Sequence, residues 1–168
     1  MHLRIETCWD GSPARPQEPV DLVVLLLDGQ LEIRIEAPFH GDPAPDHPPG
    51  PTPGLWEHEV VELFLAGPAE HYTEIELGPY GHHLVLQLEG VRQPTAELLP
   101  LDYAVEREGG LWRGRARLAA EFLPPPPHRI NACAIHGLGP ERRYLSWTAL
   151  PGESPDFHRI ERFPPFEP

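Results

Sequence analysis

The chain has 168 residues, 40 % of them hydrophobic, which is enough for one domain (residues 1–168) with a sizeable core. Its formal net charge of −13 disfavours nucleic acids and anionic membranes as partners, since both are polyanions. The same charge suits neutral or cationic ligands, or a divalent cation. No apolar run approaches the roughly 18 residues of a membrane span, and the N-terminus lacks the apolar region of a signal peptide. We therefore expect a cytoplasmic protein, with Cys8 and Cys133 as free thiols.

The first clear local signal is a hairpin at Asp28-Gly29. In DLVVLLLDGQLEIRIEA, two apolar runs flank Asp-Gly, which is the preferred two-residue hairpin turn. Pairing across this turn predicts three apolar pairs on one core face: Leu22 with Ile35, Val24 with Ile33, and Leu26 with Leu31.

Residues 37–54, APFHGDPAPDHPPGPTPG, contain seven prolines and three glycines. No regular element survives that density of proline and glycine. A connection of this length is often either functional or disordered. We expect a solvent-exposed loop that its prolines stiffen.

Later segments predict further strands separated by turn sequences such as AGPAE and GPYG. The segments are 59–65, 71–77, 82–88, 102–108, 111–118, 129–136 and 143–147. AAEFL, at 119–123, is expected to add one helical turn, and SPDFHRIERF to end the fold. About nine short strands with little helix predict an all-β protein, an antiparallel β-sandwich.

Three glutamates in neighbouring strands are predicted to share a sheet face. In HYTEIEL, alternation puts Tyr72, Glu74 and Glu76 on one side of the strand. If this strand and EVVELFL pair with their apolar sets inward, Glu62 joins them. The result is an acidic and aromatic outer patch, which Trp56 would flank at the strand entrance.

This patch has two interpretations. Carboxylates accept hydrogen bonds from sugar hydroxyls and aromatic rings pack on sugar C–H faces, so the patch suits a carbohydrate. Alternatively, it is the solvated face of an antiparallel sheet, where glutamate is a normal occupant. The strand pattern by itself leaves both interpretations open.

LWEHEVVELFL and HYTEIELGPYGHHLVL are similar to the pattern of family 9 carbohydrate-binding modules and related DOMON-like domains. There a Leu-Trp precedes an acidic strand, and a Tyr-x-Glu strand and a Pro-x-Gly turn follow. INACAIHG, RRYLSW and PDFHRIERF resemble the distal segments of the same group. More closely, nearly the whole chain resembles an uncharacterised cytosolic family of that superfamily, through Trp9-Asp10-Gly11, APF, EVVE, HLVL and AIHG.

The resemblance implies a jelly-roll-like sandwich in which two aromatic rings clamp a sugar and calcium supports the fold. By motif, Trp56 and Trp147 match the two rings. Glu62, Glu74, Asn131 and Arg143 match polar positions, whereas the acidic pair before the strand is His58-Glu59 here. Together with the face prediction, the candidate ligand-binding residues are Trp56, Glu62, Tyr72, Glu74, Glu76, Asn131, Arg143 and Trp147. No cofactor other than calcium is implied.

The expected function is non-catalytic binding of a carbohydrate or a glycosylated small molecule. A second hypothesis is a glycosidase-type hydrolase that uses the same carboxylates. Residues i and i+2 of a strand lie about 7 Å apart, a spacing that glycosidases permit, but a solvated face would not raise a carboxyl pKa. A third hypothesis is a protein-interaction module whose sheet face docks a partner.

The ten histidines do not predict a transition-metal site, because HExxH and CxxC spacings are missing from the sequence. His82 and His83 are adjacent, so on a strand they point to opposite faces. We expect the histidines on surfaces and in turns. Asp156-Phe157-His158 is expected to act as a structural lock, with Phe157 in the core and the polar side chains bonded to loop backbone near Trp147.

Overall fold

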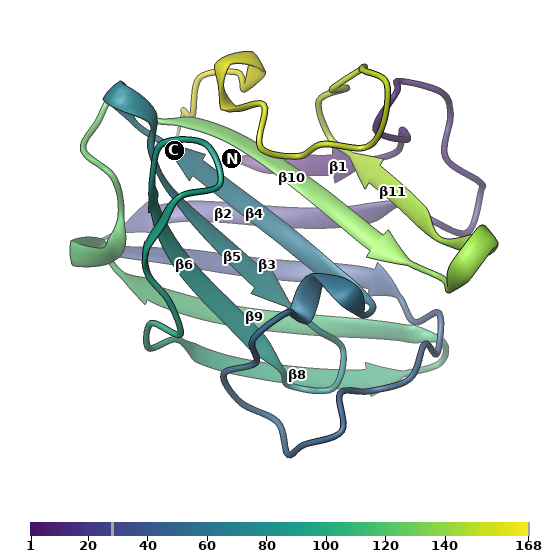
Figure 1. Cartoon of the computed structure of the whole chain (residues 1–168). Helices are drawn as coiled ribbons and strands as arrows, with labels where there is room; N and C mark the ends of the chain where they lie inside the picture. Colours follow the sequence, from purple (N-terminus) through teal and green to yellow (C-terminus); the bar gives the residue numbers. More distant parts are fainter. Residues whose placement is uncertain (28, 168) are drawn as a thin grey trace.

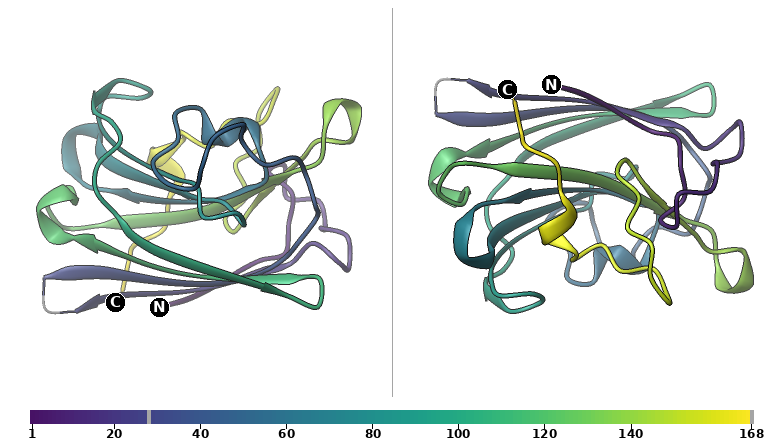
Figure 2. Two further views of the ribbon diagram at one scale, coloured as in Figure 1. Left: turned by 90° about the horizontal axis from the view of Figure 1, so that it is seen from below. Right: turned by 90° about the horizontal axis from the view of Figure 1, so that it is seen from above.

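Two antiparallel sheets pack face to face in the structure, a computed structural model that describes residues 1–27 and 29–167 (Figure 1). The end-on views of Figure 2 separate them into two layers, with both chain ends close together on the same side. The predicted antiparallel β-sandwich is therefore confirmed.

The five-stranded sheet contains, in chain order, β1 (His2–Ile5), β2 (Val20–Leu27), β3 (Gln30–Pro38), β8 (Asp102–Glu108) and β9 (Leu111–Ala119). Its spatial order is β1-β2-β3-β9-β8. The six-stranded sheet contains β4 (Val60–Ala66), β5 (His71–Leu77), β6 (His83–Glu89), β7 (Pro94–Ala96), β10 (Arg129–His136) and β11 (Arg143–Ser146). Its spatial order is β11-β10-β4-β5-β6-β7.

The helical segments of the described chain are short 3₁₀ turns: η1 (Leu55–Glu57), η2 (Pro68–Glu70), η3 (Ala120–Phe122), η4 (Gly139–Glu141) and η5 (Ile160–Arg162). None is long and apolar enough to cross a membrane. The turn η3 confirms the helical turn expected at AAEFL.

The β2–β3 hairpin has the predicted register, with Leu22, Val24 and Leu26 opposite Ile35, Ile33 and Leu31. Five of these six side chains are buried, and Leu26 is half-buried against the same core. Of the predicted turn residues, Asp28 lies outside the described residues. Gly29 has a φ of 75°, a left-handed conformation that glycine adopts without steric cost.

Two strands were not predicted, and one is longer than expected. The short strands β1 and β7 lie at sheet edges, where a proline such as Pro94 is tolerated. The strand β3 continues through Ala37 and Pro38, so the proline-rich connection begins only at Phe39.

The proline-rich connection is largely exposed, as expected, but its start is anchored. The Glu59 carboxylate accepts the backbone N–H groups of His40, Gly41 and Asp42 at 3.0, 3.0 and 3.2 Å. The Asp42 carboxylate in turn accepts the N–H of Gly137 at 2.6 Å. These bonds hold the start of the connection against the end of β10.

The six-stranded sheet is buried on both faces. Its inner face packs against the five-stranded sheet to form the main core, to which Leu63 and Ile75 contribute. Its outer face carries a second apolar cluster, in which Phe64 packs with Phe157 and Phe163 of the C-terminal segment. Of the two interpretations of this face, the solvated one is therefore wrong, because a segment without strand periodicity covers the face.

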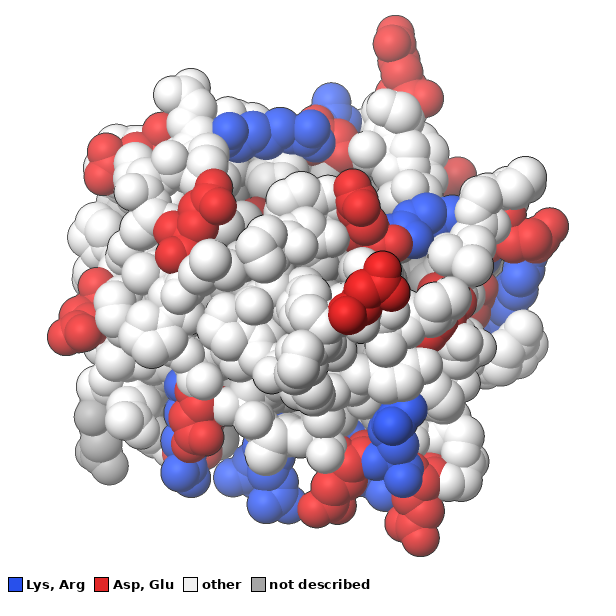
Figure 3. All heavy atoms as spheres, turned by 60° about the horizontal axis from the view of Figure 1, so that its bottom comes forward, with Lys and Arg blue, Asp and Glu red and all other residues white. Residues whose placement is uncertain are grey.

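The outer face of the five-stranded sheet is the solvated one. Arg113 of β9 pairs with Glu36 of β3 at 2.6 Å, and Arg117 pairs with Glu32 at 3.3 Å. Figure 3 shows basic and acidic side chains next to one another along its lower margin, and a few acidic side chains near the middle of the view. Alternating charge of this kind keeps one sheet face in water while the opposite face packs.

We expect Ile33→Ala to lower the free energy of unfolding by about 2–5 kcal/mol, because it leaves a cavity in the main core. The exposed neighbour Arg34→Ala should change it by less than about 0.5 kcal/mol. Urea unfolding of both variants measures the difference. A loss below half a kcal/mol for Ile33→Ala would contradict the register of the hairpin.

Candidate functional site

A cavity of about 420 Å³ opens over the outer face of the six-stranded sheet. Its walls are largely apolar and include Leu84, Leu86, Leu88, Ile135, Tyr144 and Phe157. Its polar lining comprises Glu62, Glu74, Arg92, Glu97 and His158. Trp56, in the turn η1, lies at the cavity and is 46 % exposed, so its ring is available to a ligand.

Three carboxylates gather at the floor of this cavity. Glu62 of β4 lies directly opposite Glu76 of β5, and Glu74 lies two residues away on the same face. Ligand oxygens of the three side chains all lie within 4.8 Å of one another. The predicted juxtaposition of these glutamates is confirmed, but they are buried and not in contact with bulk water.

Burial raises the pKa of all three carboxyls. For Glu62 and Glu76 burial is the main cause, and repulsion from the other glutamates of the cluster raises each pKa further. Burial likewise raises the pKa of Glu74 to about 8, although Arg92 partly opposes the shift. Three full charges are therefore not stable together in the empty site.

The buried carboxylates also lack hydrogen-bond partners. Among the described residues, Glu74 Oε2 and both carboxylate oxygens of Glu76 are buried without a partner. Buried polar atoms are nearly always paired, and an unpaired one costs roughly 1–3 kcal/mol or more when charged. Such a cluster is a candidate for ligand binding, since a ligand would supply the missing partners.

A short series of hydrogen bonds runs through Tyr72 to His158, next to the carboxylate cluster. The backbone N–H of Arg92 donates to the Tyr72 hydroxyl at 2.9 Å, and that hydroxyl lies 2.8 Å from His158 Nδ1. The Nε2 of His158 lies 4.0 Å from Glu74 Oε2. Burial, followed by Arg92, lowers the pKa of His158 to about 4, so the ring is neutral at pH 7.

The predicted lock at Asp156-Phe157-His158 forms, but with different partners. Phe157 is in the second apolar cluster, as expected. Asp156 Oδ1 accepts the backbone N–H of His158 at 3.0 Å and a guanidinium N–H of Arg92 at 2.7 Å. The polar groups therefore fasten the C-terminal segment to the loop after β6. The expected bonds to loop backbone near Trp147 are replaced by these contacts.

The structure brings together five of the predicted ligand residues. Trp56, Glu62 and Glu74 line the cavity, Glu76 completes the carboxylate cluster, and Tyr72 lies behind His158. Their part in ligand binding stays a prediction, because no ligand contact tests it.

Asn131 and Trp147 do not line the cavity. Asn131 is buried, donates to Ser146 Oγ at 3.0 Å and accepts the Thr148 N–H at 3.0 Å, so its amide already has partners. Trp147 is half-buried and packs against the main core. The expected pair of clamping rings is therefore not assembled here, where Trp56 lines the cavity and Trp147 does not.

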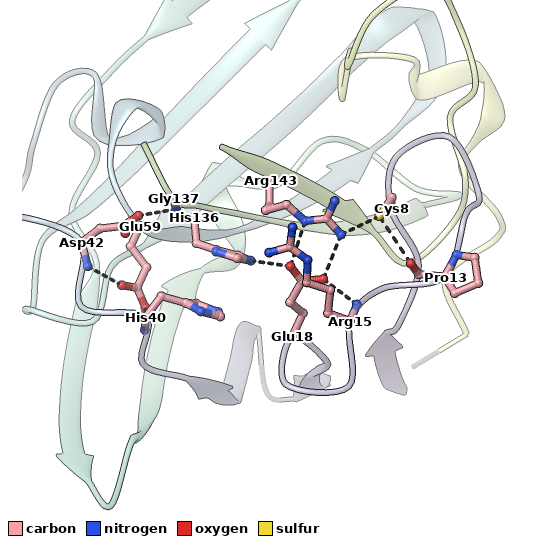
Figure 4. A network of polar contacts seen from close by, with 10 residues as sticks. All are labelled: Cys8, Pro13, Arg15, Glu18, His40, Asp42, Glu59, His136, Gly137 and Arg143. Carbon is pink, nitrogen blue, oxygen red and sulfur yellow. Dashed lines mark hydrogen bonds and ion pairs between the residues drawn. The ribbon is translucent and has the colours of Figure 1, made fainter. Parts of the chain in front are cut away.

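Arg143 belongs to a separate polar network at the end of β10 and the start of β11 (Figure 4). Its Nε and a terminal nitrogen donate to the buried Glu18 carboxylate at 2.8 and 3.0 Å. Burial would raise the pKa of Glu18, but hydrogen bonds from Arg143 and from the Arg15 backbone outweigh it and lower that pKa to about 2. This carboxylate is fully partnered, unlike those in the cavity.

Several cavity residues were missed by the sequence reasoning. Arg92 lies outside the predicted strands, and Tyr144 lies within the predicted strand 143–147, whose faces the sequence reasoning did not assign. His158 was assigned only to the lock. These residues come together because the C-terminal segment lies over the six-stranded sheet.

Comparison with known sequences shows close relatives over the full length. The chain is 39 % identical to the UPF0462 protein C4orf33 homolog of Danio rerio, covering 99 % of this chain and 88 % of the relative. It is 40 % identical to the UPF0462 protein C4orf33 of Homo sapiens, covering 99 % and 87 %. No family model matches the chain.

Solved structures share the fold at low sequence identity. A Bacteroides uniformis protein, provisionally described as carbohydrate-binding, superposes with a TM-score of 0.79 at 14 % identity, covering 99 % of this chain and 86 % of that one. A family 9 carbohydrate-binding module of Caldicellulosiruptor kristjanssonii, in complex with glucose, gives 0.60 at 12 %, covering 88 % and 74 %. The complex with cellotriose gives 0.59 at 12 %, covering 83 % and 70 %.

On acidification, His136 in the network of Figure 4 should contribute less to stability, whereas the raised pKa values of Glu62, Glu74 and Glu76 act in the opposite direction. Burial, and then the ring of His40 stacked 3.6 Å away, lower the His136 pKa from 6.5 to about 4, although Glu18 and Asp42 oppose this. The unfolded state therefore binds the proton more tightly. The stabilisation is complete above about pH 6.5 and is lost as the pH falls towards 4.

We expect His136 to account for a loss of about 1–3 kcal/mol in unfolding free energy between pH 7.5 and pH 5. Urea unfolding at both pH values measures it. His136→Phe keeps a ring against His40 and should lack this loss, so that its unfolding free energy between pH 7.5 and pH 5 falls less, or rises more, than that of the wild type. The exposed control His2→Gln should behave like the wild type. An unchanged slope in His136→Phe would contradict the assignment.

Proposed function

The chain belongs to the UPF0462 family, and we propose that it is a non-catalytic protein that binds a carbohydrate or a related polyhydroxylated small molecule. The ligand would lie in the cavity above Glu62 and Glu74. As part of the same proposal, residues 1–168 form one domain of the DOMON-like superfamily. The free thiols Cys8 and Cys133 favour a cytoplasmic location.

The cavity carries this proposal. Its floor offers Glu74 Oε2, which is buried without a partner among the described residues and which a sugar hydroxyl would satisfy as donor. Its walls are apolar, and the exposed ring of Trp56 at the edge matches the C–H face of a sugar. Mostly apolar walls with a few convergent polar groups are typical of small-molecule sites.

The structural neighbours include sugar complexes of the same fold. The family 9 modules were solved with glucose and with cellotriose, and they share the sandwich with this chain. At 12 % identity this likeness shows the fold alone, so the nature of the ligand rests on the cavity.

A hydrolase is the second candidate, and one observation favours it. Glu74 is buried with a pKa raised to about 8, so it is an acid at neutral pH beside the carboxyl of Glu62. Glycosidases use a protonated carboxyl of this kind to protonate the leaving group. The solvated face that argued against catalysis is replaced in the structure by a dry one.

Trp56→Ala should remove most of the affinity for a sugar at little cost in stability, because the ring is exposed and stacked rings act as binding hot spots. Ligands are first found on a glycan array, with glucose and cello-oligosaccharides included, and affinities then follow from calorimetry. Trp147→Ala is the matched control. It should lose stability, since the ring packs on the main core, but keep affinity.

Iodide quenching gives a second readout for Trp56. Its fluorescence should be quenched by iodide in the free protein and protected when the sugar is bound. A protein that binds no glycan on the array, or a Trp56→Ala variant with unchanged affinity, would contradict the proposed site.

The binding hypothesis also predicts no turnover of aryl glycosides. If turnover is found, the hydrolase hypothesis requires that Glu74→Gln abolish it by a factor of about 100 or more, as expected for the loss of a general acid. Glu108→Gln, at an exposed carboxylate of β8 outside the cavity lining, is the control and should leave turnover unchanged.

A further inference from the structure

The glutamate cluster has an arrangement that protons alone do not satisfy. A protonated carboxyl is a hydrogen-bond donor and needs an acceptor within about 3 Å. Both oxygens of the fully buried Glu76 lack a hydrogen bond of good geometry among the described residues, although the backbone N–H of Trp56 lies near enough to oppose the rise of its pKa. Protonation would remove the charge of Glu76 but leave its donor unpaired.

The spacing of the oxygens suits a bound cation. Carboxylate oxygens bind Ca²⁺ at roughly 2.3–2.6 Å, so two oxygens on one ion lie up to about 5 Å apart. In the structure, oxygens of Glu62, Glu74 and Glu76 lie within 4.8 Å of one another. The distances between the oxygens of these glutamates are therefore too long for hydrogen bonds but suitable for oxygens that share one cation.

An organic ligand in the cavity would not supply partners to all three carboxylates. Glu62 and Glu74 line the cavity, but Glu76 does not, because it is fully buried beneath the floor. A sugar hydroxyl therefore reaches two of the three carboxylates. A small ion among the oxygens contacts all three and balances most of their charge.

We propose that Glu62, Glu74 and Glu76 form a binding site for a hard divalent cation, of the class of Ca²⁺, Mg²⁺ or Mn²⁺, at the floor of the cavity. Oxygen-only ligands favour this class over softer metals. Through Glu62 and Glu74, the cavity provides the entry path. The inference goes beyond the proposed function, because cation binding would be measurable whether or not a sugar binds.

The first experiment is thermal unfolding of the full chain, stripped with EDTA and then supplied with CaCl₂, MgCl₂, MnCl₂ or ZnCl₂. At a concentration near 100 times Kd, the unfolding midpoint should rise by about 5–10 °C with a hard cation. TbCl₃ provides an independent readout, since Trp56 and Tyr144 line the cavity and would sensitise Tb³⁺ luminescence. Added CaCl₂ should displace that signal.

Glu76→Gln separates the proposed site from general attraction of cations to an acidic cavity. It keeps the side-chain shape and removes a buried carboxylate, so the cation-free variant should be at least as stable as the wild type. The affinity for the cation, measured from the midpoint shift and from the luminescence, should fall at least tenfold. Glu97→Gln, at the exposed edge of the cavity, should retain both.

Several outcomes would overturn the site. They are no response of the wild type to any hard cation, a response kept in full by Glu76→Gln, equal loss in Glu97→Gln, or a preference for ZnCl₂. If Glu76→Gln does not fold, as judged by near-ultraviolet circular dichroism, Glu74→Gln replaces it in the same comparison. Sugar binding by a wild type that responds to no hard cation would refute this inference and leave the proposed function standing.

Discussion

The burial of the six-stranded sheet on both faces is the constraint on which the candidate site depends. An antiparallel sheet in a sandwich normally gives one face to the core and the other to water. Here the C-terminal segment lays Phe157 and Phe163 over the outer face, where they pack with Phe64. Water is thereby removed from a face that carries three carboxylates, and their raised pKa values follow from this covering.

The covering segment is held by polar contacts as well as by its aromatic rings. Asp156 bonds to Arg92, and His158 bonds to Tyr72, so the segment is tied to the loop after β6 and to β5. His158 and Arg92 also line the cavity. The contacts that keep the face dry are therefore part of the cavity wall, and any change in them alters both stability and the site.

The sequence was sufficient where local alternation decides the structure. The Asp28-Gly29 signal and two apolar runs predicted the register of β2 and β3, and alternation in β4 and β5 predicted that Glu62 and Glu76 share a face. The sequence was not sufficient for what covers that face. The segment after Ser154 has no strand periodicity, and its position is determined by tertiary packing alone.

Motif resemblance had the same limit. It assigned Arg143 and Trp147 to the ligand face, but Arg143 reaches Glu18, which is 125 residues away in the chain, and Trp147 packs on the main core. A motif preserves residue types along a strand, whereas a binding site depends on how loops from distant segments meet above it.

Two buried acidic groups in this chain show how structural and functional carboxylates differ. Glu18 is as buried as the cavity glutamates, yet two hydrogen bonds from Arg143 and one from the Arg15 backbone satisfy it, and its pKa is lowered to about 2. Its charge stabilises the folded chain without help from outside. Glu76 has no comparable set of partners, and the burial of its carboxyl group costs stability. Replacement of these carboxylates by apolar side chains would have given a more stable sheet. The fold tolerates their cost through a large core elsewhere, which is consistent with selection for what the cluster binds.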